Sequence, residues 1–180
     1  MEKIDQLRTL VSRTAEFLIK NGIDYWADFG TLLGLYRDDD IIPWDTDADI
    51  SLEDIWLPYF MHIKDKLERK TGFIVKGSTE VRVVFEESFL DLYFWHFDKD
   101  KILGYNINKG FEHFNNRLAV DRNHINELPK VFEWKNKQKI LFPSNPEGRL
   151  IQLYGKDFMK PDKTINYWSW KNYYARSRNK

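Results

Sequence analysis

The stretch from Asp24 to Leu52, DYWADFGTLLGLYRDDDIIPWDTDADISL, constrains the fold of this chain more than any other. The alternation over 23–29 predicts a strand, which Gly30-Thr31 interrupts before a short helix begins at Leu32. A charged loop then leads through Pro43, which restricts the residue before it, to a second strand over 48–52 that carries alternate carboxylates. We therefore expect the rest of the chain to supply a sheet and helices that hold this unit.

Helices are predicted on both sides of that unit. Apolar residues at helical spacing predict a helix over 2–20, ended by Asn21-Gly22, and a second helix over 53–71, ended by Gly72. The face of the second helix that we expect to point inward carries Ile55, Trp56, Leu57, Phe60, Ile63 and Leu67. Near the C-terminus, Asn145-Pro146 is a good helix start, and it predicts a helix over 146–154.

Further strands are predicted after the second helix, at 73–76, 80–86, 89–97 and 102–107. A small hairpin is predicted from 131–134 and 139–142. Together these elements indicate an α/β (α+β) fold, with a mixed β-sheet of about five strands flanked by helices. Residues 1–160 are expected to form a single domain, and 161–180 an aromatic and then basic extension that packs on it.

Composition excludes several classes of protein. The absence of cysteine excludes disulfides, thiolate zinc sites and cysteine nucleophiles. Equal numbers of acidic and basic side chains give zero net charge, which argues against broad binding to nucleic acid or to anionic membranes. No uncharged run is long enough to span a bilayer, and the first twenty residues are too charged for a secretory signal. We expect a cytoplasmic protein without a transmembrane anchor; its oligomeric state stays open.

Carboxylates at alternate positions of the second strand are the first candidate site. Side chains two apart on a strand share a face, so Asp47 and Asp49 point together, and Asp45 continues the row if the strand geometry extends back. Neighbouring carboxylates repel unless water, a shared proton or a cation intervenes. Oxygen ligands of this kind select Mg²⁺, Mn²⁺ or Ca²⁺.

Asp91 strengthens the metal interpretation. It lies within the apolar run SFLDLYFWHF, where an unpaired buried carboxylate would be costly. If its strand lies beside the strand of Asp47 and Asp49, three carboxylates converge on one cation. The plainer alternative is that Asp91 pairs with an arginine such as Arg82. The run 38–40 is read as a solvated loop.

The order of these motifs resembles the nucleotidyltransferase superfamily and, more narrowly, the LicD family, to which the fukutin-like proteins belong. GTLLGLYR followed by IIPWDTDADI carries the resemblance, the segment around Asp91 fits the third-Asp strand of the family, and LIQLYG near the C-terminus fits more loosely. The resemblance departs at Phe29, where many members have a second glycine. The tail after Pro161 has no counterpart that we can assign.

This resemblance implies a transferase that moves a phospho-linked group, such as phosphocholine or ribitol phosphate, from a CDP-activated donor to a hydroxyl of a glycan or related acceptor. The implied site residues are Asp47, Asp49 and Asp91 as catalytic residues and ligands of Mg²⁺ (or Mn²⁺). Asp45 is implied as a substrate- or phosphate-binding residue that either supports these ligands or is an additional ligand. Gly30, Thr31 and Arg37 would hold the diphosphate of the donor. A helix N-terminus after a strand is a suitable phosphate site.

Two alternatives stay open at this point. The same metal-binding carboxylates would serve a nucleotidyltransferase that moves a nucleoside monophosphate to a small molecule or protein. A non-catalytic module that binds a nucleotide or carbohydrate is the other. The sequence names neither the donor head group nor the acceptor.

Overall fold

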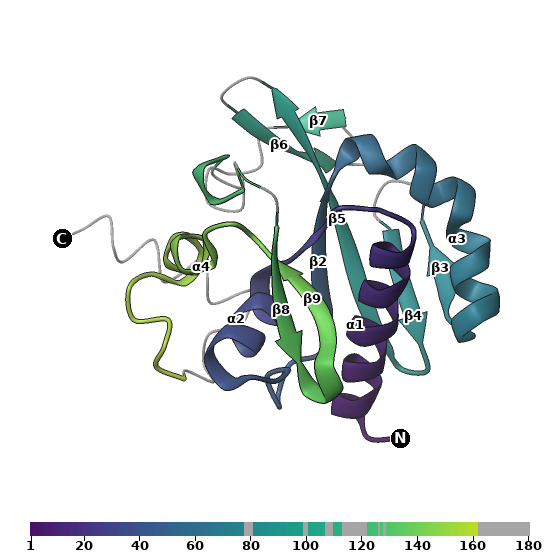
Figure 1. The fold of residues 1–180 in the computed structure, drawn as a ribbon, viewed down its shortest axis with the longest axis horizontal. Helices are drawn as coiled ribbons and strands as arrows, with labels where there is room; N and C mark the ends of the chain where they lie inside the picture. Colours follow the sequence, from purple (N-terminus) through teal and green to yellow (C-terminus); the bar gives the residue numbers. More distant parts are fainter. Residues whose placement is uncertain are drawn as a thin grey trace.

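Two parallel strands, β2 (Ala48–Glu53) and β5 (Ser88–Asp98), form the centre of the fold in the computed structural model (Figure 1). The structure describes residues 1–77, 81–98, 101–106, 110–112, 122–125, 127 and 129–161. The strand order is β1-β2-β5-β4-β3, and β6 and β7 extend the sheet from β5. The pairings other than β2–β5 are antiparallel, so the sheet is mixed, as predicted. The remaining strands of this sheet are β1 (Trp26–Ala27), β3 (Ile74–Lys76), β4 (Val81–Phe85), β6 (Lys101–Asn106) and β7 (Gly110–Glu112).

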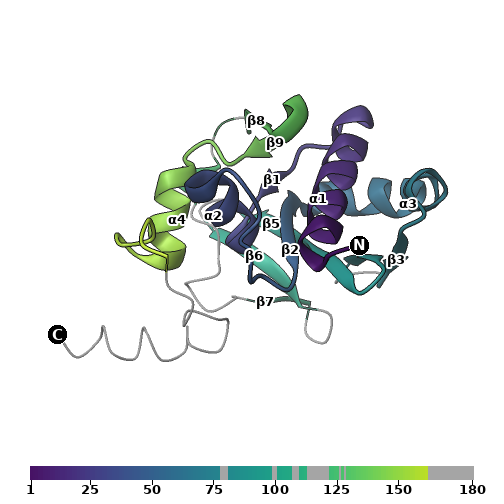
Figure 2. The same ribbon diagram turned by 90° about the horizontal axis from the view of Figure 1, so that it is seen from below.

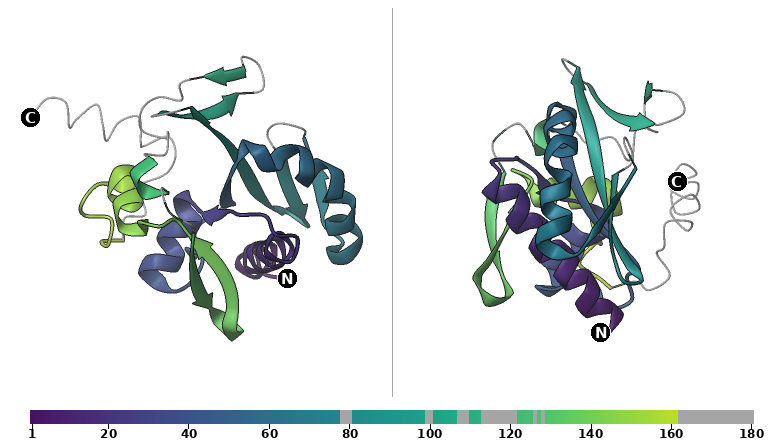
Figure 3. Two further views of the ribbon diagram at one scale, coloured as in Figure 1. Left: turned by 45° about the horizontal axis from the view of Figure 1, so that its top comes forward. Right: turned by 90° about the vertical axis from the view of Figure 1, so that its right-hand side faces the viewer.

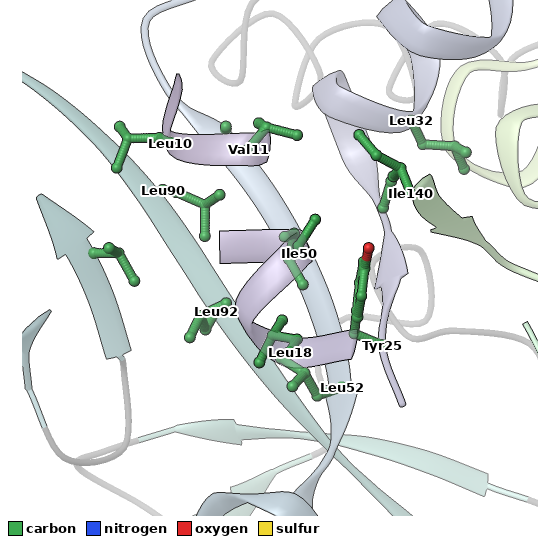
Figure 4. Packing of buried hydrophobic residues seen from close by; sticks show 14 of the residues in the cluster. Leu10, Val11, Leu18, Tyr25, Leu32, Ile50, Leu52, Leu90, Leu92 and Ile140 are labelled. Carbon is green, nitrogen blue, oxygen red and sulfur yellow. The ribbon is translucent and has the colours of Figure 1, made fainter. Parts of the chain in front are cut away.

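Helices α1 (Lys3–Lys20) and α3 (Leu57–Thr71) lie on the same side of the sheet (Figure 2). Alternate residues of the two central strands point toward them and are fully or almost fully buried. Figure 4 shows Ile50 and Leu52 of β2 and Leu90 and Leu92 of β5 packed near Leu10 and Leu18 of α1. Because strand side chains alternate, the intervening residues of β2 and β5, which include the aspartates, point to the opposite face.

The other edge of the domain is formed by α2 (Phe29–Asp38), α4 (Pro146–Tyr154) and a two-stranded sheet of β8 (Lys130–Trp134) and β9 (Gln138–Phe142), which Figure 3 shows from two sides. Side chains fasten the hairpin to the domain: the Leu141 amide donates to Tyr25 Oη (3.2 Å), and Trp134 Nε1 donates to the Asp39 carbonyl (3.2 Å). The hairpin and α4 were both predicted from the sequence, and both are confirmed.

Three local predictions need correction. The predicted strand over 23–29 is reduced to β1, because Asp28 already caps α2 and the helix begins at Phe29. The predicted helix over 53–71 is a strand end, a short 3-10 helix (Asp54–Trp56) and then α3, whose first turn contains Pro58. Ile55 is consequently 67% exposed instead of inward-facing.

Within the acidic run at 38–40, Asp38 and Asp39 are exposed, as predicted, whereas Asp40 is partly buried. Asp40 accepts hydrogen bonds from the Arg8 guanidinium (2.5 and 3.0 Å) and from Lys135 Nζ (2.5 Å), so it joins α1 to the segment after β8. These cations lower the pKa of Asp40 to about 2, against the effect of its partial burial. The predictions for 162–180 and for Ile107 lie outside the described residues. Within the described part, no helix is both long and apolar enough to cross a membrane.

Candidate active site

Asp49 and Asp91 lie directly opposite each other on the parallel pair β2–β5. The register aligns Ala48 with Leu90 and Ile50 with Leu92, which places the apolar residues on the core face and both aspartates on the other. The condition on which the metal interpretation depended, that these two strands are neighbours, is therefore confirmed. Asp49 is 9% exposed, and its backbone carbonyl accepts from the Asp28 amide (3.3 Å).

Asp45 and Asp47 bring further negative charge to the same place. Burial and then the charge of Asp47 raise the pKa of Asp45 to about 6. Burial and then the charge of Asp91 raise the pKa of Asp47. The pKa of Asp49 is raised well above its usual range, first by burial and then by Asp47, Asp45 and Asp91 in that order. Burial and neighbouring negative charge therefore disfavour the ionised forms of Asp45, Asp47 and Asp49.

Gly30 and Thr31, at the start of α2, are brought to these carboxylates. A methyl group on Gly30 would lie 2.5 Å from Asp45 Oδ2, so only a residue without a side chain lets that carboxylate approach the helix. Thr31 Oγ1 accepts a hydrogen bond from the Asp49 amide (2.8 Å). The side chain of Thr31 therefore fixes the helix start to the aspartate strand.

Arg37 is not brought to the carboxylates. It lies at the opposite end of α2 from Gly30, about 10 Å along the helix axis at the usual rise per residue. Its guanidinium forms a two-point contact with the adjacent Asp38, with Nε at 2.9 Å and Nη2 at 2.7 Å from the carboxylate oxygens. Its diphosphate-binding role stays a prediction.

Asp91 has the partner that the plainer alternative named. Arg82 Nε and Nη2 donate to its two oxygens at 2.6 and 2.8 Å. Among the described residues, no three acidic or histidine side chains are arranged closely enough to hold a metal ion. The possible metal ligands are four aspartates. Burial and neighbouring negative charge raise the pKa of three of them, Asp45, Asp47 and Asp49. Carboxylate oxygens are hard ligands of the kind that suits Mg²⁺ or Mn²⁺. Ligation of such a cation by Asp47, Asp49 and Asp91 stays a prediction.

Sequence reasoning missed the most buried charges beside the site. Asp28 and Arg149 are both fully buried, and Arg149 Nε and Nη2 donate to the two Asp28 oxygens at 2.8 and 3.0 Å. Asp28 also accepts from the Phe29 amide (2.9 Å), Ser51 Oγ (2.8 Å) and Trp26 Nε1 (3.3 Å). It thus joins β1, β2, α2 and α4. Its helix-capping role was recognisable from the Asp before the helix, but its distant partner had no local signal.

Tyr154, at the end of α4, is a second residue that sequence reasoning did not assign to the site. Its pKa is raised well above the usual range by burial and then by the negative charges of Asp49, Asp45 and Asp28. Its phenol therefore lies near the carboxylates. The LIQLYG motif, which contains it, was the available signal. A surface pocket lined by Asp24, Trp26, Glu53, Ile125, Glu127, Pro129, Pro143 and Ser144 includes none of the predicted carboxylates.

Comparison with known proteins gives relatives in sequence and in structure. An uncharacterised protein of Rickettsia typhi is 30% identical over 154 residues, which is 85% of this chain and 47% of that protein. An uncharacterised protein of Rickettsia prowazekii is 31% identical over 157 residues, 85% of this chain and 55% of that protein. The chain thus spans about half the length of these curated relatives.

Among solved structures, the lincomycin-bound lincosamide antibiotic adenylyltransferase LnuA aligns with a TM-score of 0.49 at 18% identity, over 87% of this chain and 89% of that one. The solution structure of the antibiotic-resistance factor ANT(2'')-Ia aligns with a TM-score of 0.49 at 8% identity, over 99% of this chain and 85% of that one.

The sequence profile of the LicD/FKTN/FKRP nucleotidyltransferase domain matches residues 22–146, which include β1, α2 and both aspartate strands. The match covers the segments in which the resemblance was first seen, the Gly30 turn and the aspartates of β2 and β5. The chain belongs to the LicD/FKTN/FKRP nucleotidyltransferase-domain family.

Proposed function

We propose that this domain is a metal-dependent phosphotransferase. It would move a phospho-linked group, such as phosphocholine or ribitol phosphate, from a CDP-activated donor to a hydroxyl of a glycan or related acceptor. Membership of the LicD/FKTN/FKRP family supports a transferase of this kind. The observation that carries the proposal is the register of β2 and β5, which sets Asp49 beside Asp91 on one face of the sheet.

In this proposal Asp47, Asp49 and Asp91 hold Mg²⁺ or Mn²⁺, with Asp45 as an additional ligand. The bound cation would neutralise charge on the diphosphate and on the departing nucleoside monophosphate. Thr31 keeps the Asp49 strand at a fixed distance from α2 through its bond to the Asp49 amide. This bond would preserve the ligand geometry during substrate binding.

The start of α2 is proposed to receive a phosphate of the donor. The N-terminus of a helix favours an anion, and Gly30 presents no side chain that would hinder one there. Asp91 would accept the proton of the acceptor hydroxyl, because a carboxylate beside the reacting phosphorus can act as a general base. The group that leaves is the nucleoside monophosphate, so the reaction releases CMP when the donor is CDP-linked.

The test is incubation of the protein with a panel of CDP-linked donors and Mg²⁺, with CMP release as the readout. Asp47→Asn and Asp49→Asn should abolish release while circular dichroism shows an unchanged fold. Asp157→Asn is the matched control, because Asp157 is 76% exposed in an ion pair remote from the sheet. Full activity in both the Asp47 and Asp49 variants would refute the assignment.

A strict nucleotidyltransferase is the second candidate. The family is described as a nucleotidyltransferase domain, which favours this candidate. Both reactions break a phosphoanhydride bond next to a bound cation, so the same carboxylates would serve either one. The mass of the product distinguishes them. An acceptor that gains a nucleoside monophosphate identifies a nucleotidyltransferase, and one that gains the donor's phospho-linked head group identifies a phosphotransferase.

A further inference from the structure

A row of charges runs across the sheet at the level of the carboxylates. The strand registers place Asp49 opposite Asp91, Asp91 opposite Arg82, and Arg82 opposite Lys76. Residues directly opposite on neighbouring strands share a face, so two carboxylates are followed by two cations on one surface. At the usual strand spacing, Arg82 lies about 10 Å from Asp49 across the sheet. A polyanion bound over the aspartates with a cation would have the basic half of this row within reach.

Arg82 is held so that it can serve both halves of the row. Its guanidinium carbon lies 3.8 Å from the centroid of the Phe89 ring, and Nε and Nη2 bond to Asp91. A guanidinium has five N–H donors in a planar fork, so this contact engages only part of it. The side chain is 46% exposed, whereas that of Asp91 is 19% exposed. The cation is therefore anchored by an aromatic face and a carboxylate, with the rest of its surface open to a ligand.

The ion pair with Asp91 conflicts with the proposed role of that carboxylate. Both Asp91 oxygens accept from Arg82 at short distance, so a cation bound to either oxygen would lie close to the positive charge of the guanidinium. Arg82 is half-exposed, so solvent and salt screen this ion pair, and an anionic ligand can compete for the guanidinium. The Arg82 fork matches a phosphate as well as it matches a carboxylate.

We infer that Arg82 changes partners when substrate binds, an inference that rests on the proposed function. In the free protein it holds Asp91; once Asp91 faces the cation with Asp47 and Asp49, Arg82 binds a phosphate oxygen of the nucleoside diphosphate. Phe89 keeps the guanidinium beside the site in both arrangements. Arg82 is therefore a substrate-binding residue that, in the free protein, is paired with the proposed metal ligand Asp91.

The inference predicts opposite shifts in two affinities, which calorimetry on the full chain can measure. In Arg82→Met, Asp91 loses its competitor, so Mn²⁺ alone should bind up to about fivefold more tightly. CDP, titrated in saturating Mn²⁺, should bind at least about tenfold more weakly, because a charge-assisted contact to phosphate is lost. Arg69→Met is the matched control, since Arg69 is exposed on α3, and it should change neither affinity.

Arg82→Lys provides an independent arm should the methionine variant fold poorly. It keeps the positive charge but loses the planar fork, so CDP should bind several-fold more weakly at nearly unchanged Mn²⁺ affinity. Parallel weakening of Mn²⁺ and CDP, or no change in either, would overturn the exchange of partners. A wild-type protein that binds neither Mn²⁺ nor CDP would instead overturn the proposed function, and this inference with it.

Discussion

The buried ion pair between Asp28 and Arg149 provides the sharpest test of how the site is held in place. Each group would be an uncompensated charge in the interior without the other. Asp28→Asn preserves the shape of the side chain and its ability to cap α2 but removes the negative charge. Arg149→Met preserves most of the apolar stem and removes the positive charge.

The expected magnitude follows from the geometry. Contacts of 2.8 and 3.0 Å place the charge centres about 4 Å apart, which is worth about 4 kcal/mol at an effective dielectric constant of 20. Removing one partner of a buried pair typically costs about 3–5 kcal/mol. Asp28→Asn should lie at the upper end, because Arg149 cannot lose its proton. Arg149→Met should lie at the lower end, because Asp28 keeps three other donors.

The assay is urea denaturation at pH 7, followed by circular dichroism and tryptophan fluorescence, on wild type, both single variants and the double variant. The double variant should lose less free energy of unfolding than the two single variants combined, by at least about 2 kcal/mol. The reason is that it leaves no unpaired charge buried. Asp157→Asn, at an exposed ion pair, should cost less than about 0.5 kcal/mol. Additive single costs would refute the reasoning, since they would mean that the two charges do not interact.

Four further predictions concern α2 and the carboxylates. Gly30→Ala should fold, because a side-chain carboxylate can yield to the new methyl, but it should weaken Mn²⁺ binding; Gly34→Ala should cost at least about 2 kcal/mol of stability, because its methyl would lie 2.6 Å from a backbone carbonyl. Thr31→Val should cost about 1–3 kcal/mol by urea denaturation, since it leaves the buried Asp49 amide without its acceptor, and Thr31→Ser should restore most of it. The pKa of Asp45, about 6 in the folded state against 3.8 ordinarily, means that its contribution to stability is fully present below pH 3.8 and is lost as pH rises through 6. Without divalent cations, denaturation midpoints should therefore fall between about pH 4 and 6 in wild type and fall less in Asp45→Asn.

Local patterns were sufficient to predict the elements that carry the site. Alternation of apolar and acidic residues predicted β2 and the Asp91 strand, and because alternation also fixes the faces, the pairing of Asp49 with Asp91 followed once the strands were neighbours. Gly72 ends α3 with a φ of +74°, as the glycine predicted. These features depend on neighbours in sequence, so sequence reasoning reaches them.

The features that could not be predicted depend on distant partners. Phe29 has a φ of +45°, a left-handed conformation that an aromatic residue seldom adopts, and its ring packs 5.0 Å from that of Tyr93 on β5. The start of α2 is therefore set partly by a tertiary contact. The ion pair of Arg82 with Asp91 was predicted only as an alternative. A buried carboxylate needs a positive partner, and the sequence pattern does not distinguish an arginine from a metal ion. Ile55 was misplaced because an apolar residue can sit on a helix face or in the preceding turn with the same local sequence.

The Asp28–Arg149 contact also sets a time order during synthesis of the chain. Its partners are 121 residues apart, and a ribosome adding about 5–20 residues per second needs about 6–24 s to pass from one to the other. Both aspartate strands emerge during that interval, while the pocket for the Asp28 carboxylate still lacks its cation. The last helix of the described domain thus supplies the counter-charge for a carboxylate made in the first third of the chain.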